Sequence, residues 1–114
     1  MNKHIKKKIY TTLSYLHDEL DSSYELKNTL DYETQLGELV CNETRIKLLR
    51  DYIKLFNLIK QGEGILEMTT RVAKRNKLHF YQLKKLGSRN YEDNEKYFKT
   101  LMCVVLSLQL NTII

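Results

Sequence analysis

Residues 69–89 read TTRVAKRNKLHFYQLKKLGSR, and the apolar spacing inside this stretch decides whether it forms one helix or two. A single helix needs apolar residues three and four positions apart along one stripe. The stripe that includes Ala73 is interrupted by Asn76 and Lys77 before it resumes at Phe80. A turn near Asn76 would let each half bury its own apolar side. The stretch therefore predicts two short helices joined by a turn.

Small and apolar residues fall where two crossing helices need them. Val72 and Ala73 stand at the expected crossing, and Ala73 is the only alanine of the chain. Leu78 follows the turn and can plug the corner, while Leu83 and Leu86 lie three apart on the inner face of the second helix. This pattern resembles that of helix-turn-helix DNA-binding proteins, over this stretch only and without pointing to a particular family. The turn departs from the motif because it lacks the usual glycine.

The resemblance implies that residues 65–89 form a DNA-binding unit whose second helix enters the major groove. Gln82 would pair with adenine, the lysines with guanine or phosphate, and the aromatic rings with thymine methyl groups. The residues expected to face the groove are His79, Phe80, Tyr81, Gln82, Lys84 and Lys85. The residues expected to hold the DNA backbone are Thr69, Thr70, Lys74 and Arg75. Arg89 completes the expected DNA-binding set.

The distribution of charge favours a polyanionic partner. The net charge of +5 is unevenly spread, because residues 18–43 are strongly acidic, with Lys27 as their only base. Residues 68–91 contain no acid at all. Their basic side chains are Arg71, Lys74, Arg75, Lys77, Lys84, Lys85 and Arg89. A segregated basic block of this kind is what neutralisation of nucleic-acid phosphates requires.

The whole chain has the composition of a single all-α domain. Its 114 residues include no proline and four glycines, with 42% hydrophobic and 29% charged residues. We expect a compact bundle of five to six helices, in which residues 1–60 support the helix-turn-helix of residues 65–89. An amphipathic helix is predicted by the spacing of Ile5, Ile9, Leu13, Leu16 and Leu20.

Two helix boundaries are predicted within residues 1–60. The first helix should end at residues 21–23, because Ser22 and Glu25 have the spacing of a capping box for a second helix. Asn42 or Thr44 could cap a third helix. Gly87 should stop the last helix of the two-helix unit.

The C-terminal segment, residues 92–114, predicts a dimerisation helix. Its apolar residues populate nearly every side of a helix, so that some would remain exposed in a monomer. In residues 104–111, apolar side chains at every second position alternate with mostly polar ones, which is typical of a strand. A short strand is therefore the alternative. We expect a homodimer built largely on residues after Tyr97, since two-fold symmetry suits DNA-binding proteins of this size.

Catalytic and cofactor chemistry is not indicated. The chain has no Gly-rich phosphate loop, nucleophile elbow or Cys–His motif, so we expect no enzyme, no cofactor and no metal. Cys41 and Cys103 are isolated, and they should stay reduced and buried. Because no signal peptide or membrane span is visible, a cytoplasmic protein is expected.

Two functions remain open. The first is a transcriptional regulator, or a plasmid or phage factor, that binds duplex DNA. The second is a protein-interaction module, such as an immunity protein or an inhibitor of another protein, without nucleic-acid binding. In that case the acidic residues 18–43 and the eight tyrosines would form the contact surface.

Overall fold

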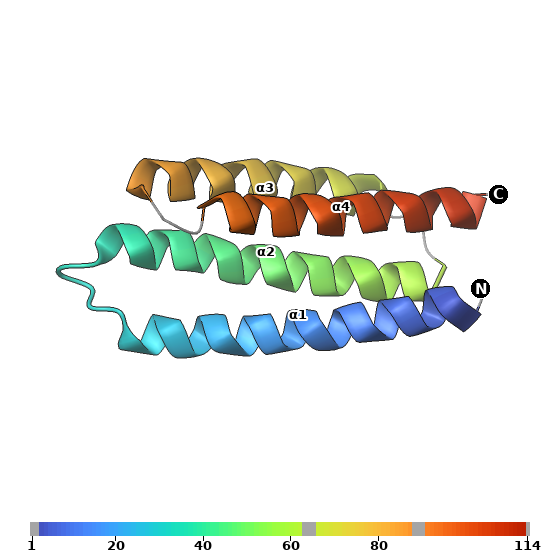
Figure 1. The fold of residues 1–114 in the computed structure, drawn as a ribbon, viewed down its shortest axis with the longest axis horizontal. Coiled ribbons are helices and arrows are strands. Elements are labelled where there is room, and N and C mark those ends of the chain that lie inside the picture. Colours follow the sequence, from blue (N-terminus) through green and yellow to red (C-terminus); the bar gives the residue numbers. More distant parts are fainter. Residues whose placement is uncertain (1–2, 63–65, 88–90, 114) are drawn as a thin grey trace.

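The structure, a computed structural model, describes residues 3–62, 66–87 and 91–113, with side chains up to residue 108. Within these residues the helices are α1 (Lys3–Thr29), α2 (Leu36–Lys60), α3 (Leu66–Leu86) and α4 (Tyr91–Ile113). They run alternately up and down along the long axis, so the first and last helices bring both chain ends to the same end of the molecule (Figure 1). The all-α class is confirmed, but the expected five to six helices are wrong, because the described residues form four.

α1 continues through the segment for which the sequence predicts a helix boundary. Its predicted apolar stripe is buried at Ile9, Leu13 and Leu16. The boundary expected at Ser22 is wrong. The hydroxyl of Ser23 donates to the Glu19 carbonyl oxygen at 2.9 Å, and Asn42 of α2 donates to the Ser23 carbonyl oxygen at 2.9 Å. A serine whose polar groups are satisfied in this way can sit inside a packed helix.

α2 forms one helix where the sequence predicts a boundary near Asn42 or Thr44. Both residues lie inside α2 and are buried, so neither caps a helix. The chain turn lies earlier, where the Asp31 backbone N–H donates to the Gln35 side chain at 2.9 Å. α2 supplies much of the core through Leu48, Leu49, Tyr52, Leu55, Phe56 and Ile59.

α3 is continuous, so the turn expected at Asn76 and Lys77 is wrong. The reason is a polar contact inside the core. Asn76 is buried, and its amide nitrogen donates to the Tyr52 hydroxyl at 2.8 Å. The apolar stripe of α3 is therefore not broken at Asn76 but includes it. Leu78, expected to plug a corner between two helices, is 49% exposed. α3 ends before Gly87, whose positive φ of 68° confirms the predicted stop.

α4 completes the bundle as a helix, and the alternative of a strand is wrong for the described part of the segment. Leu101, Val105 and Leu108 point into the core, together with the fully buried Phe98. The expected burial of both cysteines holds for Cys41, whereas Cys103 is exposed on α4. None of the helices in the described ranges has both the length and the apolar character needed to cross a membrane.

Candidate nucleic-acid interface

The outward face of α3 contains a subset of the residues expected to contact DNA. The exposed members of the expected set are Thr70, Lys74, Tyr81, Lys84 and Lys85. Their spacing places them along one side of a continuous helix that is about 30 Å long. Arg71 and Lys77, which belong to the same basic block, are also exposed. The continuous helix thus keeps a basic face without the helix-turn-helix.

Other expected contacts lie in the protein interior. Thr69 and His79 are buried, the latter with 1% of its surface exposed. Phe80 is half-buried and packs against Phe98 of α4, with ring centroids 6.3 Å apart. Gln82 is also half-buried, and its side-chain oxygen is shielded from solvent. These side chains cannot reach a DNA groove while the helix remains packed.

The two arginines of the expected DNA-binding set are Arg75 and Arg89. Arg75 is half-buried because its guanidinium forms an ion pair with Asp51 of α2, which leaves it at the edge of the α2–α3 contact. Arg89 lies outside the described residues.

α2 contributes basic residues that are not among the expected DNA contacts. Lys47, Arg50 and Lys54 are exposed and lie three and four positions apart, on one side of α2. Together with Arg75 and Asp51 they line a hollow of about 490 Å³ between α2 and α3. Four cations and one carboxylate therefore surround this hollow. The spacing of the three α2 residues can be seen in the sequence. It does not show that they lie beside α3, because that depends on how α2 packs on α3.

We call the combined area the α2–α3 basic surface. Its members are Lys47, Arg50 and Lys54 of α2 and Arg71, Lys74, Lys77 and Lys85 of α3. Among the described residues, none of these seven forms an ion pair. Lys85 lies over the ring of Tyr81, with its ammonium 5.4 Å from the ring centroid. The positive charge of this surface is therefore available to an external anion.

Lys84 lies at the α4 side of the same face. It is within electrostatic reach of Glu95 of α4, whose pKa is lowered mainly by the hydrogen bond from Lys99. Because Lys84 lies toward α4 rather than α2, we do not include it in the α2–α3 basic surface.

A Cys–His contact also occurs, although the sequence shows no such motif. The Sγ atom of Cys41 on α2 lies 3.8 Å from Nδ1 of His79 on α3. Burial raises the pKa of the Cys41 thiol and lowers the pKa of His79 to about 4. Both groups are therefore neutral near pH 7, whereas a nucleophilic cysteine acts as a thiolate. The contact is a packed neutral pair rather than a catalytic one.

Comparisons with known proteins give no match for the chain. No protein-family model matches it, and neither the curated proteins nor the solved structures contain a significantly similar chain.

Proposed function

We propose that this protein binds duplex DNA through contacts of the α2–α3 basic surface with the phosphate backbone. The observation that carries the proposal is the set of seven exposed cations of this surface, on two adjacent helices, none of which forms an ion pair within the described ranges. The three cations of α2 line the hollow, where Arg75 of α3 is paired with Asp51. Such a set can neutralise several phosphates at once and release their counterions. The basic block of α3 supplies one half of the surface, and α2 supplies the other.

Backbone contacts suit this surface better than base recognition. A helix-turn-helix reads bases with side chains at the start of a separate second helix. Here His79 and Phe80, which would start that second helix, lie in the middle of a continuous α3. His79 is buried in the bundle, and Phe80 packs against Phe98 of α4. Lysine and arginine side chains along the outer faces of two helices can reach phosphates whatever the base sequence.

A duplex is favoured over a single strand by the shortage of stacking surfaces. Proteins that bind single strands combine positive charge with several aromatic platforms for the bases. On the described part of α3, Tyr81 is the one aromatic side chain that is largely exposed, and the Lys85 ammonium lies over one side of its ring. A charged surface without a row of aromatic rings matches the regular phosphates of a duplex.

Fluorescence anisotropy with labelled duplexes of unrelated sequence tests the proposal. We expect binding at about 50 mM salt that weakens steeply as salt rises, with similar affinity for every sequence. Replacing Lys47, Arg50 and Lys54 together by glutamine should weaken binding at least about tenfold, because each removes a phosphate contact. Lys74→Gln with Lys77→Gln should act in the same direction.

A matched control removes two cations from another helix. Lys96 and Lys99 of α4 are exposed, and Lys99 pairs with Glu95. The double variant Lys96→Gln and Lys99→Gln should bind duplexes nearly as well as the unmodified protein. Equal losses in this control and in the double variant of Lys74 and Lys77, which also removes two cations, would mean that total charge, rather than this surface, governs binding. Absence of binding at low salt would contradict the proposal.

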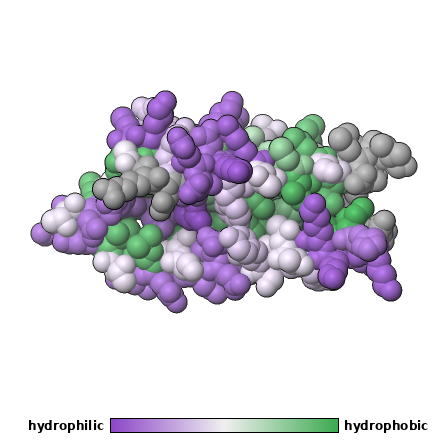
Figure 2. Space-filling view, viewed as in Figure 1, coloured by the Kyte–Doolittle hydropathy of each residue, from purple (hydrophilic) through white to green (hydrophobic). Residues whose placement is uncertain are grey.

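A homodimer remains part of the proposal. Hydrophobic residues lie over the C-terminal half of α4 on the face shown in Figure 2. Leu106 of α4 is 46% exposed. A second copy could cover this area. Light scattering at micromolar concentration tests the dimer: twice the chain mass supports it, and the mass of a single chain contradicts it.

A further inference from the structure

A groove lies among the four helices, and its lining includes Leu26, Leu30 and Glu38. These residues are at or near the end of the bundle where the chain passes from α1 to α2 (Figure 1). Residues of all four helices line it, and it encloses about 450 Å³. Small-molecule sites in proteins typically enclose roughly 300–1,000 Å³. The apolar part of its lining is Leu26, Leu30, Leu83 and Leu86. We call it the end groove.

The apolar lining is only partly covered by the protein itself. Leu26 and Leu86 at the rim are 48% and 42% exposed, whereas Leu83 is 7% exposed. Figure 2 shows hydrophobic residues at the surface over the C-terminal end of α1, which carries one wall of the groove. An alkyl chain placed between these leucines would remove apolar surface from water.

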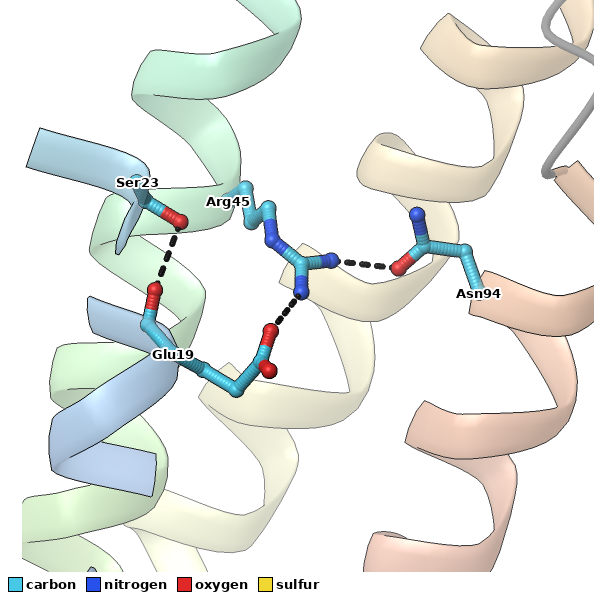
Figure 3. A network of polar contacts seen from close by, with 4 residues as sticks. All are labelled: Glu19, Ser23, Arg45 and Asn94. Atoms are coloured by element: carbon cyan, nitrogen blue, oxygen red, sulfur yellow. Dashed lines mark hydrogen bonds and ion pairs between the residues drawn. The ribbon is translucent and has the colours of Figure 1, made fainter. Parts of the chain in front are cut away.

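The polar part of the lining offers directed hydrogen bonds. Arg45 reaches from α2 to Glu19 of α1, at 2.8 Å, and to the side-chain oxygen of Asn94 on α4 (Figure 3). A guanidinium has five N–H groups. Among the described residues only these two acceptors bond to Arg45, so three of its N–H groups have none. The amide nitrogen of Asn94 is likewise a free donor within that part of the chain.

An acceptor is present beside these donors. Asn42, which is 5% exposed, donates its amide nitrogen to the Ser23 carbonyl oxygen and so keeps its own side-chain oxygen for another donor. Buried polar side chains that converge beside an apolar hollow are typical of ligand sites.

The floor of the groove carries no net charge near pH 7. Cys41 and His79 line it, and burial keeps the thiol protonated and the imidazole neutral. Nε2 of His79 is buried and has no hydrogen-bond partner among the residues that the structure describes, which is unusual for a packed imidazole. The positive charge of Arg45 is balanced by Glu19, and Glu38 adds a carboxylate to the lining. An anionic ligand would meet the like charge of Glu38, and a cationic head placed beside Arg45 would meet the like charge of the guanidinium.

We propose that the end groove binds a small uncharged amphipathic molecule, with an amide or alcohol head facing Arg45 and Asn94 and an alkyl chain against the leucines. The head accepts hydrogen bonds from Arg45 and Asn94 and donates one to the Asn42 oxygen. The chain fills the space between Leu26 of α1 and Leu83 of α3. This site is independent of the DNA-binding proposal, because it shares no residue with the α2–α3 basic surface.

The test uses probes that share a six-carbon chain and differ in the head group. Hexanamide, hexanoate and hexylamine are titrated into the full-length protein while the backbone amide signals are followed by NMR. We expect saturable shifts for hexanamide, centred on the amides of Leu26, Leu83, Gly87 and Asn94. Hexanoate and hexylamine should bind at least tenfold more weakly. Tighter binding of either charged probe would overturn the assignment of an uncharged ligand.

A pair of variants separates the end groove from general hydrophobic binding. Leu83→Phe adds bulk to the groove and should reduce hexanamide affinity at least tenfold. Leu66→Phe makes the same change on α3 at a position that is 78% exposed and outside the groove, and should leave the affinity unchanged. Shifts in the unmodified protein that spread to Leu66 or Leu106, or that fail to saturate, would overturn the proposal even if Leu83→Phe does not fold.

Discussion

Acid should destabilise the folded protein through His79, because this residue must then take up a proton in the core. Its ring is 1% exposed and meets the ring of Phe98 edge-on, with centroids 5.6 Å apart. Burial, followed by the positive charge of Arg45, lowers the pKa of His79 from 6.5 to about 4. The unfolded chain keeps the ordinary value, so the unfolded state binds the proton first as the pH falls.

The size and pH range of the effect follow from the two pKa values. The contribution of neutral His79 to stability is fully present above pH 6.5 and is lost progressively as the pH falls from 6.5 towards 4. A difference of this size between folded and unfolded pKa corresponds to a total loss of about 3 kcal/mol. That is a large share of the stability of a small domain.

Urea unfolding between pH 4 and pH 8 measures this loss. Carboxylates also titrate in acid, so the unmodified protein is compared with His79→Phe, which keeps a ring in the core and removes the titrating group. The free-energy difference between the two proteins should change by about 3 kcal/mol over this range, in favour of the variant at low pH. His17→Asn, at an exposed histidine of α1, serves as the control. Parallel loss of stability in the unmodified protein and His79→Phe would refute the burial of this imidazole.

Three further substitutions probe the packing. Leu78→Lys should change the free energy of unfolding by less than about 0.5 kcal/mol, because the side chain is 49% exposed. A loss of several kcal/mol in thermal melts would instead indicate that Leu78 is buried between two helices. Arg45→Leu should cost about 1–3 kcal/mol by leaving Glu19 without its cation, and a neutral result in urea unfolding would contradict the polar network. Tyr52→Phe should cost about 1–3 kcal/mol, because buried Asn76 loses its acceptor; unchanged stability by calorimetry would argue against that hydrogen bond.

The parts of the fold that the sequence predicts correctly depend on local patterns. The stripe of Ile9, Leu13 and Leu16 needs only helical periodicity, and the stop at Gly87 needs only the conformational freedom of glycine. The break at Asn76 was predicted wrongly because an asparagine in an apolar stripe suggests an interruption. Its partner, the Tyr52 hydroxyl, lies 24 positions away, and periodicity carries no information about such a contact.

In the candidate interface, too, the features that local patterns determine can be predicted, and those that depend on distant contacts cannot. Exposure of Lys74 and Lys85 follows from charge and helical spacing. Burial of His79 cannot be predicted in this way, because a polar ring in a basic helical segment is expected to be exposed. It is buried because α2 and α4 pack against it. The basic residues of α2 become part of the interface only because Asp51 and Arg75 come together. That register between helices depends on contacts that are distant in sequence.

The salt dependence of duplex binding tests the central claim most directly. The slope of log affinity against log salt reports the number of phosphates neutralised, at about 0.9 per contact. The α2 variant without Lys47, Arg50 and Lys54 should have a slope shallower by about 2 to 3 than that of the unmodified protein, on every duplex sequence tested. An unchanged slope in this variant, or tight binding to one sequence alone, would contradict backbone recognition by the α2–α3 basic surface.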